Sequence, residues 1–454
     1  MRVVVLFVCF CFVTTCFAEN KKEPIVDLST NYEENIDFVK RLNDYAAELF
    51  GNSLTDDEIE NSINSIKREL DGIPSQKILL TDLILLYRER LLDKAREADL
   101  HFCISPVDSF NVSEGLPFCM ICKDGHLYVE YSEDKKIKRG DEILSINSVS
   151  KDEILRYSYK WRYYDGNSVL RRCHYMYSDK YNVEFKRNDK IQKCAIKGVE
   201  KCETPFRNTI IFNKEKVGYF NLQNFIDDKL PEKMSVFIDS LQKLGISDLI
   251  IDIRKNGGGN SNMINDFFSI MSDAPNYEGF RAAKIKISPY TKEAVKQMFG
   301  EYVDTLDFHD GAFVDTENLY EKIKENAKVD TVDFFCVNLN KEKYKKGMRY
   351  YIWIGEDTGS TAAMFARCAQ MNKIALLVGE ETQINPDRYG NVIVIPWNGS
   401  DRMTVSFSTT KFEYVFEYES ALYPDIEIRL DPHKICREGD LQIQELLKKI
   451  EANR

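Results

Sequence analysis

The feature that most constrains this chain is an apolar run that ends in three consecutive glycines, Leu-Ile-Ile-Asp-Ile-Arg-Lys-Asn-Gly-Gly-Gly at residues 249–259. Residues 249–253 lack the apolar–polar alternation of a half-exposed strand, so they predict a strand buried on both faces. Glycines directly after a strand let the backbone approach a ligand with its N–H groups pointing at that ligand. A helix-like apolar segment follows at 263–271. The patterns G-x-G-x-x-G and G-K-[ST] are absent there, so neither a dinucleotide site nor a P-loop is indicated.

A second strand-to-helix turn lies about a hundred residues further on. Residues 350–355 are rich in aromatic and β-branched side chains, residues 356–359 form a turn, and Ser360 opens an alanine-rich helix pattern at 361–369. A third buried strand is predicted at 374–378. A serine at such a turn lies at the positive end of the helix dipole, which favours a developing oxyanion. Serine is also a preferred helix cap, so the position by itself leaves a purely structural role open.

Four short motifs follow one another along the chain. Residues 252–259 are D-I-R-K-N-G-G-G, 358–362 are T-G-S-T-A, 378–382 are V-G-E-E-T, and 424–428 are P-D-I-E-I. In this order they resemble the motifs D-L-R-x-N-x-G-G, T-x-S-[SA]-A, V-G-E-x-T and P-D-[IV]-x-[IV] of the C-terminal-processing (tail-specific) serine peptidase family. The resemblance covers roughly residues 90–430.

The resemblance implies both a fold class and a chemistry. The fold is α/β, with a ClpP/crotonase-like peptidase core, a PDZ-like β-rich module and an N-terminal helical region. Ser360 would attack the scissile carbonyl of a peptide or protein substrate. Backbone N–H groups of Gly257 or Gly258 and of Thr361 would hold the oxyanion, and neither a metal nor an organic cofactor is implied.

The general base departs from the pattern of many family members, which carry a lysine just after G-E-x-T. Asn385 stands there, and an asparagine amide cannot accept the serine proton. The tricorn-like branch of the family uses a histidine from a D-[LG]-H motif that ends a helical region. Asp99-Leu100-His101 stands at that place, after the helical-looking stretch 78–98, so the resemblance implies His101 as the base. Asn385 and its neighbour Arg388 are then expected to contact substrate.

Four other histidines compete with His101 for this role. His126 also ends a D-G-H triplet, but it precedes an alternating strand at 127–131, so Asp124-Gly125 predicts a hairpin turn. His309 lies between acids in an insertion, and His174 and His433 have no accompanying motif.

The third member of the triad is expected just ahead of the late Pro-Asp. Glu419 and Glu417 occupy that segment, with Glu419 slightly favoured, and both would point to one face of a strand. The family's Gly-[IV] before Pro-Asp is replaced by residues 421–423, Ala-Leu-Tyr, so neither glutamate falls on the expected offset.

The first 18 residues have the pattern of a secretory signal peptide: Arg2, an apolar core at 3–13, and Cys16-Phe17-Ala18 before the cleavage point. The mature chain should therefore begin at Glu19. It should be secreted or reside in the lumen of an endolysosome or another vesicle. No other stretch has the about 18 apolar residues of a spanning helix, so no stable membrane insertion is expected.

In an oxidising secretory compartment, the cysteines can form disulfides and two of the asparagines can be glycosylated. Of 12 cysteines, the three at positions 9, 11 and 16 leave with the signal. Nine then remain, which predicts structural disulfides and at least one thiol without an intramolecular partner. Asn111-Val-Ser and Asn398-Gly-Ser are potential glycosylation acceptors.

The chain divides by pattern into five parts. Residues 137–147, around Gly140-Asp-Glu-Ile-Leu-Ser-Ile-Asn, resemble the G-D-x-I-L-x-I-N signature of PDZ domains, which bind peptides by adding a strand to a sheet edge. A net charge of −11 and a pI near 5.3 argue against a nucleic-acid partner. The parts are a signal peptide (1–18), a helical region (19–104), the PDZ-like module (105–205), a peptidase core (206–435, insertion 275–345) and a C-terminal helix (436–454).

Two other classes of function remain open from sequence. The core is reused by non-catalytic retinoid-binding proteins, and the missing lysine would fit an inactive relative that binds a ligand or peptide. The PDZ-like module would fit an interaction protein. The presence of both Ser360 and His101 favours the peptidase.

Overall fold

The structure is a computed structural model of the full chain. The signal peptide, both glycosylation acceptors and the histidines at 174, 309 and 433 lie outside the residues that it describes. The described residues are 25–27, 55–73, 77–92, 99, 101–106, 115–157, 163–164, 179–200, 202, 208–286, 329–333, 337–396, 403–429 and 441–454.

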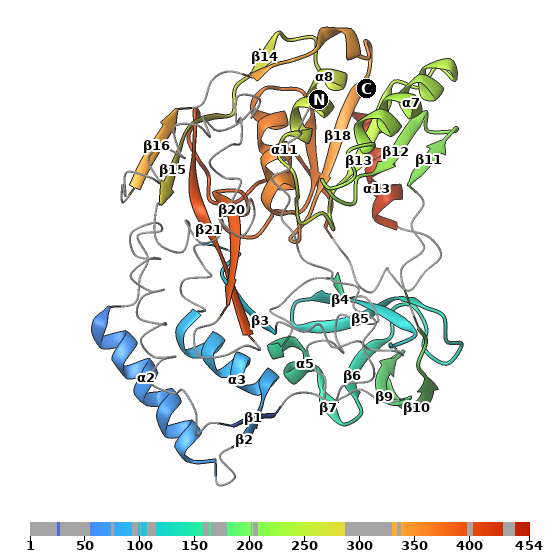
Figure 1. The fold of residues 1–454 in the computed structure, drawn as a ribbon. Helices are drawn as coiled ribbons and strands as arrows, with labels where there is room; N and C mark the ends of the chain where they lie inside the picture. The colour runs from blue at the N-terminus through green and yellow to red at the C-terminus, as the bar shows by residue number, and fades with distance from the viewer. Residues whose placement is uncertain are drawn as a thin grey trace.

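A six-stranded sheet forms the core, in the order β11-β12-β13-β18-β19-β22 (Figure 1). All neighbouring strands from β12 to β22 are parallel, whereas β11 joins the edge antiparallel. The predicted strands at 249–253, 350–355 and 374–378 are confirmed as β13, β18 and β19, with ends that differ by no more than two residues. The bounds are β11 (Thr209–Phe212), β12 (Val217–Asn221), β13 (Asp248–Asp252), β18 (Arg349–Ile354), β19 (Leu376–Gly379) and β22 (Ile426–Glu427).

Helices cover both faces of this sheet, which is why its strands are apolar throughout. One face packs against α7, α8 and α11, and the other packs against α13. All five residues of β13 are buried as a result. The helices are α7 (Leu230–Lys243), α8 (Met263–Met271), α11 (Ser360–Met371) and α13 (Leu441–Ala452).

A second, antiparallel sheet lies below the core in Figure 1 and has its own apolar cluster. Its order is β10-β9-β6-β5-β4-β8, with β7 paired to β6. Asp124 and Gly125 have positive φ values of 51° and 75°, as the predicted hairpin turn requires. The sheet lies within the predicted PDZ-like module, whose peptide-binding role stays a prediction. Its elements are β4 (Phe118–Lys123), β5 (His126–Ser132), β6 (Glu142–Ile146), β7 (Val149–Ser150), α5 (Lys151–Tyr157), β8 (Tyr163–Tyr164), β9 (Lys180–Arg187) and β10 (Lys190–Lys197).

A third sheet combines the predicted insertion with segments far away in sequence. Its order is β16-β15-β21-β20, and β3, from the N-terminal region, pairs with β21. The described parts of the insertion also contribute a small β14–β17 ladder and the 3-10 turn η4. The bounds are β3 (Cys103–Pro106), β14 (Asn276–Tyr277), β15 (Phe280–Lys286), β16 (Val329–Asp333), β17 (Val337–Asn338), η4 (Lys341–Lys343), β20 (Tyr389–Pro396) and β21 (Met403–Tyr414).

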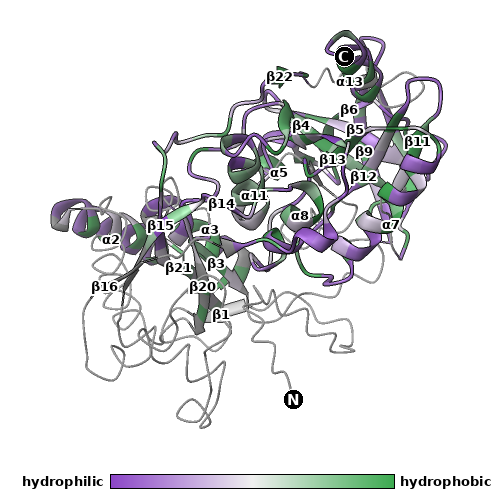
Figure 2. Ribbon diagram, turned by 90° about the horizontal axis from the view of Figure 1, so that it is seen from above, coloured by the Kyte–Doolittle hydropathy of each residue, from purple (hydrophilic) through white to green (hydrophobic). Residues whose placement is uncertain are grey.

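The N-terminal region is mainly helical where it is described, with one exception. Thr55 and Glu58 form a capping box at the start of α2 (Asp56–Asp71), and Figure 2 shows α2 banded with hydrophilic and hydrophobic residues. The predicted helix at 78–98 begins instead as strand β2 (Lys77–Leu79), because these residues pair with β1 (Ile25–Asp27). The chain then forms α3 (Leu80–Tyr87) and the π-helical turn η1 (Arg88–Leu92).

Two absences hold for the described ranges. None of the helices placed there has the length and apolar character needed to cross a membrane. No disulfide joins any two of the six cysteines within those ranges, so the expected disulfides remain a prediction.

Candidate active site

The glycine loop after β13 is organised by one buried side chain, Asn256. Its Nδ2 donates to Leu222 O at 2.8 Å, and its Oδ1 accepts the Gly258 N–H at 2.9 Å. Its backbone carbonyl accepts the Gly359 N–H at 3.1 Å. Asn256 is fully buried and therefore joins the loop to the turn before α11. No role for Asn256 was predicted from the sequence.

Ser360 lies at the first position of α11 in a left-handed conformation, with φ of 49°. This region is sparsely populated by residues other than glycine, so the surrounding structure must hold the residue there. Its N–H donates to Pro386 O at 2.6 Å. The N-cap residue is Gly359, and no side chain caps the helix. The alternative that Ser360 is only a helix cap is therefore wrong, and none of the described residues hydrogen-bonds its hydroxyl.

Two unpartnered backbone N–H groups lie beside Ser360. A β-carbon on Gly258 would lie 2.7 Å from Ser360 Cβ and 2.8 Å from Thr361 N, so only glycine allows this approach. The Gly258 N–H is already donated to Asn256. In the described part of the chain, the N–H groups of Gly257 and Thr361 have no acceptor, and Gly257 is exposed.

Asn385 and Arg388 lie in the segment that contacts Ser360 through the Pro386 carbonyl. Asn385 has φ of 54°, a conformation that asparagine tolerates better than most residues. The Arg388 guanidinium carbon lies 4.5 Å from the centre of the Tyr418 ring. Arg388 also lines a cavity of about 370 Å³, together with residues 412–418 and Arg281.

Of the site residues expected from the sequence, Arg388 and Glu417 line this cavity and Asn385 does not. Asn385 instead lies on the neighbouring turn, where its N–H donates to Ser420 O.

His101 precedes β3 and is held by two buried side chains. Asp99 Oδ1 lies 2.9 Å from His101 Nδ1, and the Ser408 hydroxyl lies 3.1 Å from the same nitrogen. Asp99 is 1% exposed, and it also accepts the backbone N–H groups of His101 and Ser408 at 3.0 and 2.9 Å. Burial raises the pKa of Asp99, but the hydrogen bond and charge of His101 and the Ser408 N–H outweigh it, so the pKa lies below its ordinary value.

The carboxylate that contacts His101 is therefore that of Asp99, and not that of either glutamate favoured from the sequence. Glu417 and Glu419 are both exposed, and neither is hydrogen-bonded to the imidazole. They follow the end of β21 at Tyr414, whereas Asp99 is held by Ser408 in the middle of that strand. The late Pro-Asp motif lies at the start of β22, where Asp425 accepts the Leu377 N–H at 2.7 Å.

Ser360 begins α11 on the core sheet, whereas His101 precedes β3 of the third sheet, and no hydrogen bond joins them within the described structure. The rival His126 is 44% exposed on β5, and its Nδ1 lies 2.6 Å from Glu142 Oε1. This is the solvated strand position that the sequence predicted for it.

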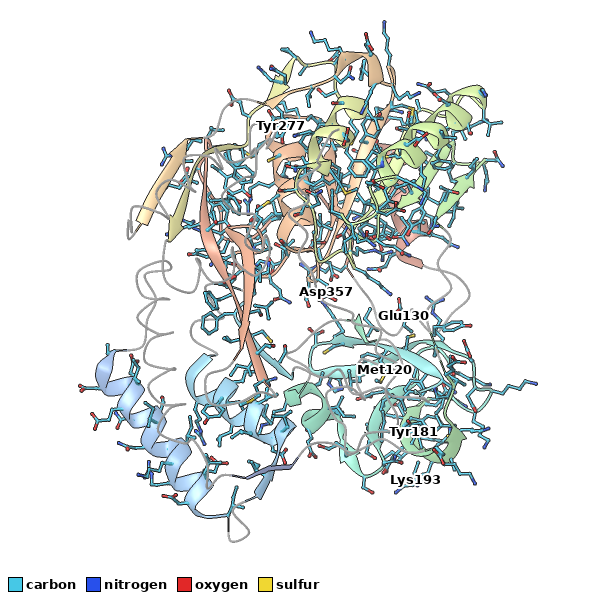
Figure 3. All side chains as sticks on the ribbon, in the orientation of Figure 1. Met120, Glu130, Tyr181, Lys193, Tyr277 and Asp357 are labelled. Atoms are coloured by element: carbon cyan, nitrogen blue, oxygen red, sulfur yellow. The ribbon has the colours of Figure 1, made fainter. Side chains whose placement is uncertain are left out.

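The second sheet contacts the loops around Ser360 through two ion pairs. Lys255, in the glycine loop, lies 2.7 and 2.8 Å from the carboxylate oxygens of Glu130 on β5. Lys123 on β4 lies 3.3 Å from Glu380, which follows β19. Figure 3 shows Glu130 on the side of the second sheet that faces Asp357, in the turn before Ser360.

Nothing in the described ranges points to a metal centre, since no three histidine, cysteine or acidic side chains come together there. The groups available for chemistry at this site are a serine hydroxyl, an imidazole, a carboxylate and backbone N–H groups. Groups of these kinds catalyse acyl transfer.

The fold and the site define a serine-type peptidase, which is a hydrolase. Residues 216–393 match the sequence model described as Peptidase family S41. The resemblance to C-terminal-processing peptidases is thereby confirmed, whereas the histidine-using branch remains a proposal. No curated protein matches the sequence.

The chain is similar to several solved structures at low sequence identity, and those with a TM-score above 0.5 share its fold. Mature CPAF complexed with lactacystin has 13% identity and a TM-score of 0.60, over 92% of this chain and 98% of that chain. A CPAF mutant has 12% identity and a TM-score of 0.61, over 92% of this chain and 96% of that chain. The photosystem II D1 C-terminal processing protease has 12% identity and a TM-score of 0.45, over 88% and 93%.

Proposed function

We propose that this protein is a secreted peptidase that cleaves peptide bonds through Ser360 as nucleophile and His101 as general base. The observation that carries the proposal is the environment of Ser360. Its hydroxyl has no partner in the described structure, its backbone is held in a left-handed conformation, and two N–H groups beside it lack acceptors. A helix cap or a core serine needs none of these features.

The proposed first step is acylation of Ser360. Its Oγ forms a bond to the scissile carbonyl carbon while His101 takes the hydroxyl proton. The carbonyl oxygen becomes an oxyanion that the N–H groups of Gly257 and Thr361 stabilise. The C–N bond then breaks, and His101 gives its proton to the leaving amine. Water, deprotonated by His101, hydrolyses the acyl-enzyme in the second half of the reaction.

Asp99 is the acid proposed to orient His101, in place of Glu417 or Glu419. With Nδ1 hydrogen-bonded to Asp99, the other ring nitrogen, Nε2, is the one that can accept the serine proton. A buried carboxylate also stabilises the imidazolium that forms. The imidazole must reach hydrogen-bond distance of Ser360 in the substrate complex, as catalytic contacts often tighten only on binding.

Asn385 and Arg388 are proposed to bind substrate beside Ser360. The segment that carries them contacts the nucleophile directly, since the Pro386 carbonyl accepts the Ser360 N–H. Arg388 and Tyr418 line the cavity of about 370 Å³, which is large enough to take a side chain of the peptide.

The proposed location is the lumen of the secretory pathway or the outside of the cell. It rests on the signal-peptide pattern of residues 1–18. Amino-terminal sequencing of the protein recovered from the medium or the vesicular lumen tests it. A chain that begins at Glu19 is the expected result, and a retained Met1 on the functional protein would contradict it.

A fluorophosphonate probe tests the nucleophile, because it forms a covalent bond only with an activated serine. The wild type and Ser240→Ala, a control on the exposed face of α7, should be labelled, whereas Ser360→Ala should not. Labelling of Ser360→Ala would assign the nucleophile elsewhere. An unlabelled, folded wild type would favour the inactive binding protein instead.

A further inference from the structure

The helix that begins with Ser360 contacts a buried carboxylate, that of Asp387. Asp387 is 0% exposed, and Arg367 on α11 is 4% exposed. Asp387 Oδ2 accepts from Arg367 Nε and from the Tyr414 hydroxyl, both at 2.6 Å. Its Oδ1 accepts from Arg367 Nη2 at 3.1 Å and from the Tyr418 hydroxyl at 3.0 Å. These four residues, here called the Asp387 cluster, join α11, the segment 385–388 and the end of β21.

Fold stability alone does not account for this arrangement. Removing two charges from water costs free energy that their attraction only partly offsets, so apolar side chains of similar volume often stabilise a fold equally well. The ion pair does offer a fixed geometry, since a bidentate contact allows little rotation of either group. Burial, and next the charge of Asp387, raise the pKa of Tyr418 and Tyr414, so both hydroxyls stay protonated and keep donating.

The cluster lies one residue from the backbone that holds Ser360. Pro386, next to Asp387, accepts the Ser360 N–H at 2.6 Å. Ser360 needs such support, because its φ of 49° is a strained conformation for serine. Arg367 is seven positions after Ser360, so both lie on the same side of α11. The ion pair therefore connects the helix that carries Ser360 to the segment that supplies its acceptor.

We infer that Arg367 and Asp387 are positioning residues for Ser360. By fixing segment 385–388 against α11, they hold the Pro386 carbonyl where it keeps Ser360 in its left-handed conformation, with the hydroxyl beside the Gly257 and Thr361 N–H groups. This inference rests on the proposed role of Ser360 as nucleophile. Neither residue touches substrate, so their loss should lower kcat and leave KM nearly unchanged.

The decisive variant replaces both charges at once, as Arg367→Met with Asp387→Leu. No buried charge is left unpaired, so the protein should fold, which circular dichroism and the thermal midpoint Tm check. A misplaced nucleophile should lower kcat and the rate of fluorophosphonate labelling by roughly 10²-fold. The midpoint of the pH–rate profile should stay at the wild-type value, because His101 and Asp99 are untouched.

A matched control replaces a similar ion pair remote from Ser360. Arg187 and Asp141 in the second sheet are bidentate, at 2.6 and 2.5 Å, and Asp141 is 2% exposed. Arg187→Met with Asp141→Leu should shift Tm about as much as the cluster variant but leave kcat unchanged. An equal fall of kcat in both double variants would mean that kcat follows fold stability and would overturn the inference.

Tyr418→Phe gives a test that does not depend on replacing charges. It removes one hydrogen bond to Asp387 and keeps the ring, so a smaller fall of kcat, roughly 3- to 10-fold, is expected. Wild-type kcat in folded Tyr418→Phe and in the double variant would overturn the inference. Ser360→Ala, measured in parallel, separates the two proposals: if it keeps full activity, the proposed nucleophile fails, and the positioning role fails with it.

Discussion

The two halves of the proposed catalytic site are built in different ways. The Ser360 half stands on the parallel core sheet, where loops from the ends of β13, β18 and β19 meet at one edge. Asn256 and Pro386 fix it through buried contacts to the backbone. The His101 half stands on the third sheet, where the four-residue strand β3 pairs with β21 and Asp99 bonds to Ser408. The nucleophile is thus held by the core itself, whereas the base is delivered by a separate element.

Because the two halves are built on different sheets, a substitution can disrupt one half and leave the other intact. Nothing in the Ser360 half depends on a hydrogen bond from His101, and the Asp99–His101–Ser408 contacts do not involve the core sheet. Variants in one half should therefore leave the geometry of the other intact.

Ser360→Ala should have the largest effect. Loss of the nucleophile should lower kcat by at least about 10³-fold, with only transition-state binding left to act. The thermal midpoint should barely change, because the hydroxyl makes no capping bond whose loss would cost about 1 kcal/mol. Peptide hydrolysis and thermal unfolding of the same preparation measure both quantities. Continued turnover by the folded variant would remove Ser360 from the mechanism.

His101→Gln should come next, with a loss of kcat of roughly 10²- to 10⁴-fold, the usual contribution of a general base. His126→Gln is the matched control, since His126 is 44% exposed and bonds to Glu142 in the second sheet. It should keep wild-type kcat. If the two variants lost activity equally, or His126→Gln alone did, the base would have to be reassigned.

Asp99→Asn should lower kcat by about 10²-fold or more, because an amide cannot fix the ring tautomer or stabilise the imidazolium. Glu419→Gln and Glu417→Gln should have little effect, since both glutamates are exposed. A large loss in either glutamate variant with full activity in Asp99→Asn would restore the acid expected from sequence.

Asp99 also predicts a dependence of stability on pH. Its pKa in the folded state is below the ordinary value of about 3.9, so its stabilising effect is fully present above that pH. The effect is lost as the pH falls through the lower, folded-state pKa. The difference in unfolding free energy between the wild type and Asp99→Asn should therefore shrink below about pH 4, as denaturant titrations at several pH values would show. A difference that stays constant down to pH 2 would contradict the shift.

Asn385→Ala should have the smallest effect, a rise of KM by roughly 3- to 10-fold with kcat retained. The amide is expected to hydrogen-bond the substrate, whereas the Pro386 carbonyl that supports Ser360 remains in place. Michaelis–Menten kinetics decide between this result and a fall in kcat. A fall in kcat alone would mean that Asn385 acts on the nucleophile half instead of on the substrate.

The sequence determined the core of this protein because its signals are local. Continuous apolar runs ending in glycine, serine or Gly-Glu predicted β13, β18 and β19, and the alanine-rich pattern after Ser360 predicted α11. The helix start at Thr55 and the hairpin at Asp124-Gly125 followed from capping and turn chemistry in the same way.

Tertiary structure alone decided which side chains meet. Asp99 is only two positions from His101, yet its burial and its bond to Ser408, 309 positions away, appear only once β3 pairs with β21. The strand Lys77–Leu79 arose within a helical pattern because residues 25–27 pair with it. The Asp387 cluster likewise unites three separate elements. Local propensity depends on neighbouring residues, whereas a charge or a strained backbone is tolerated only where distant segments supply its partners.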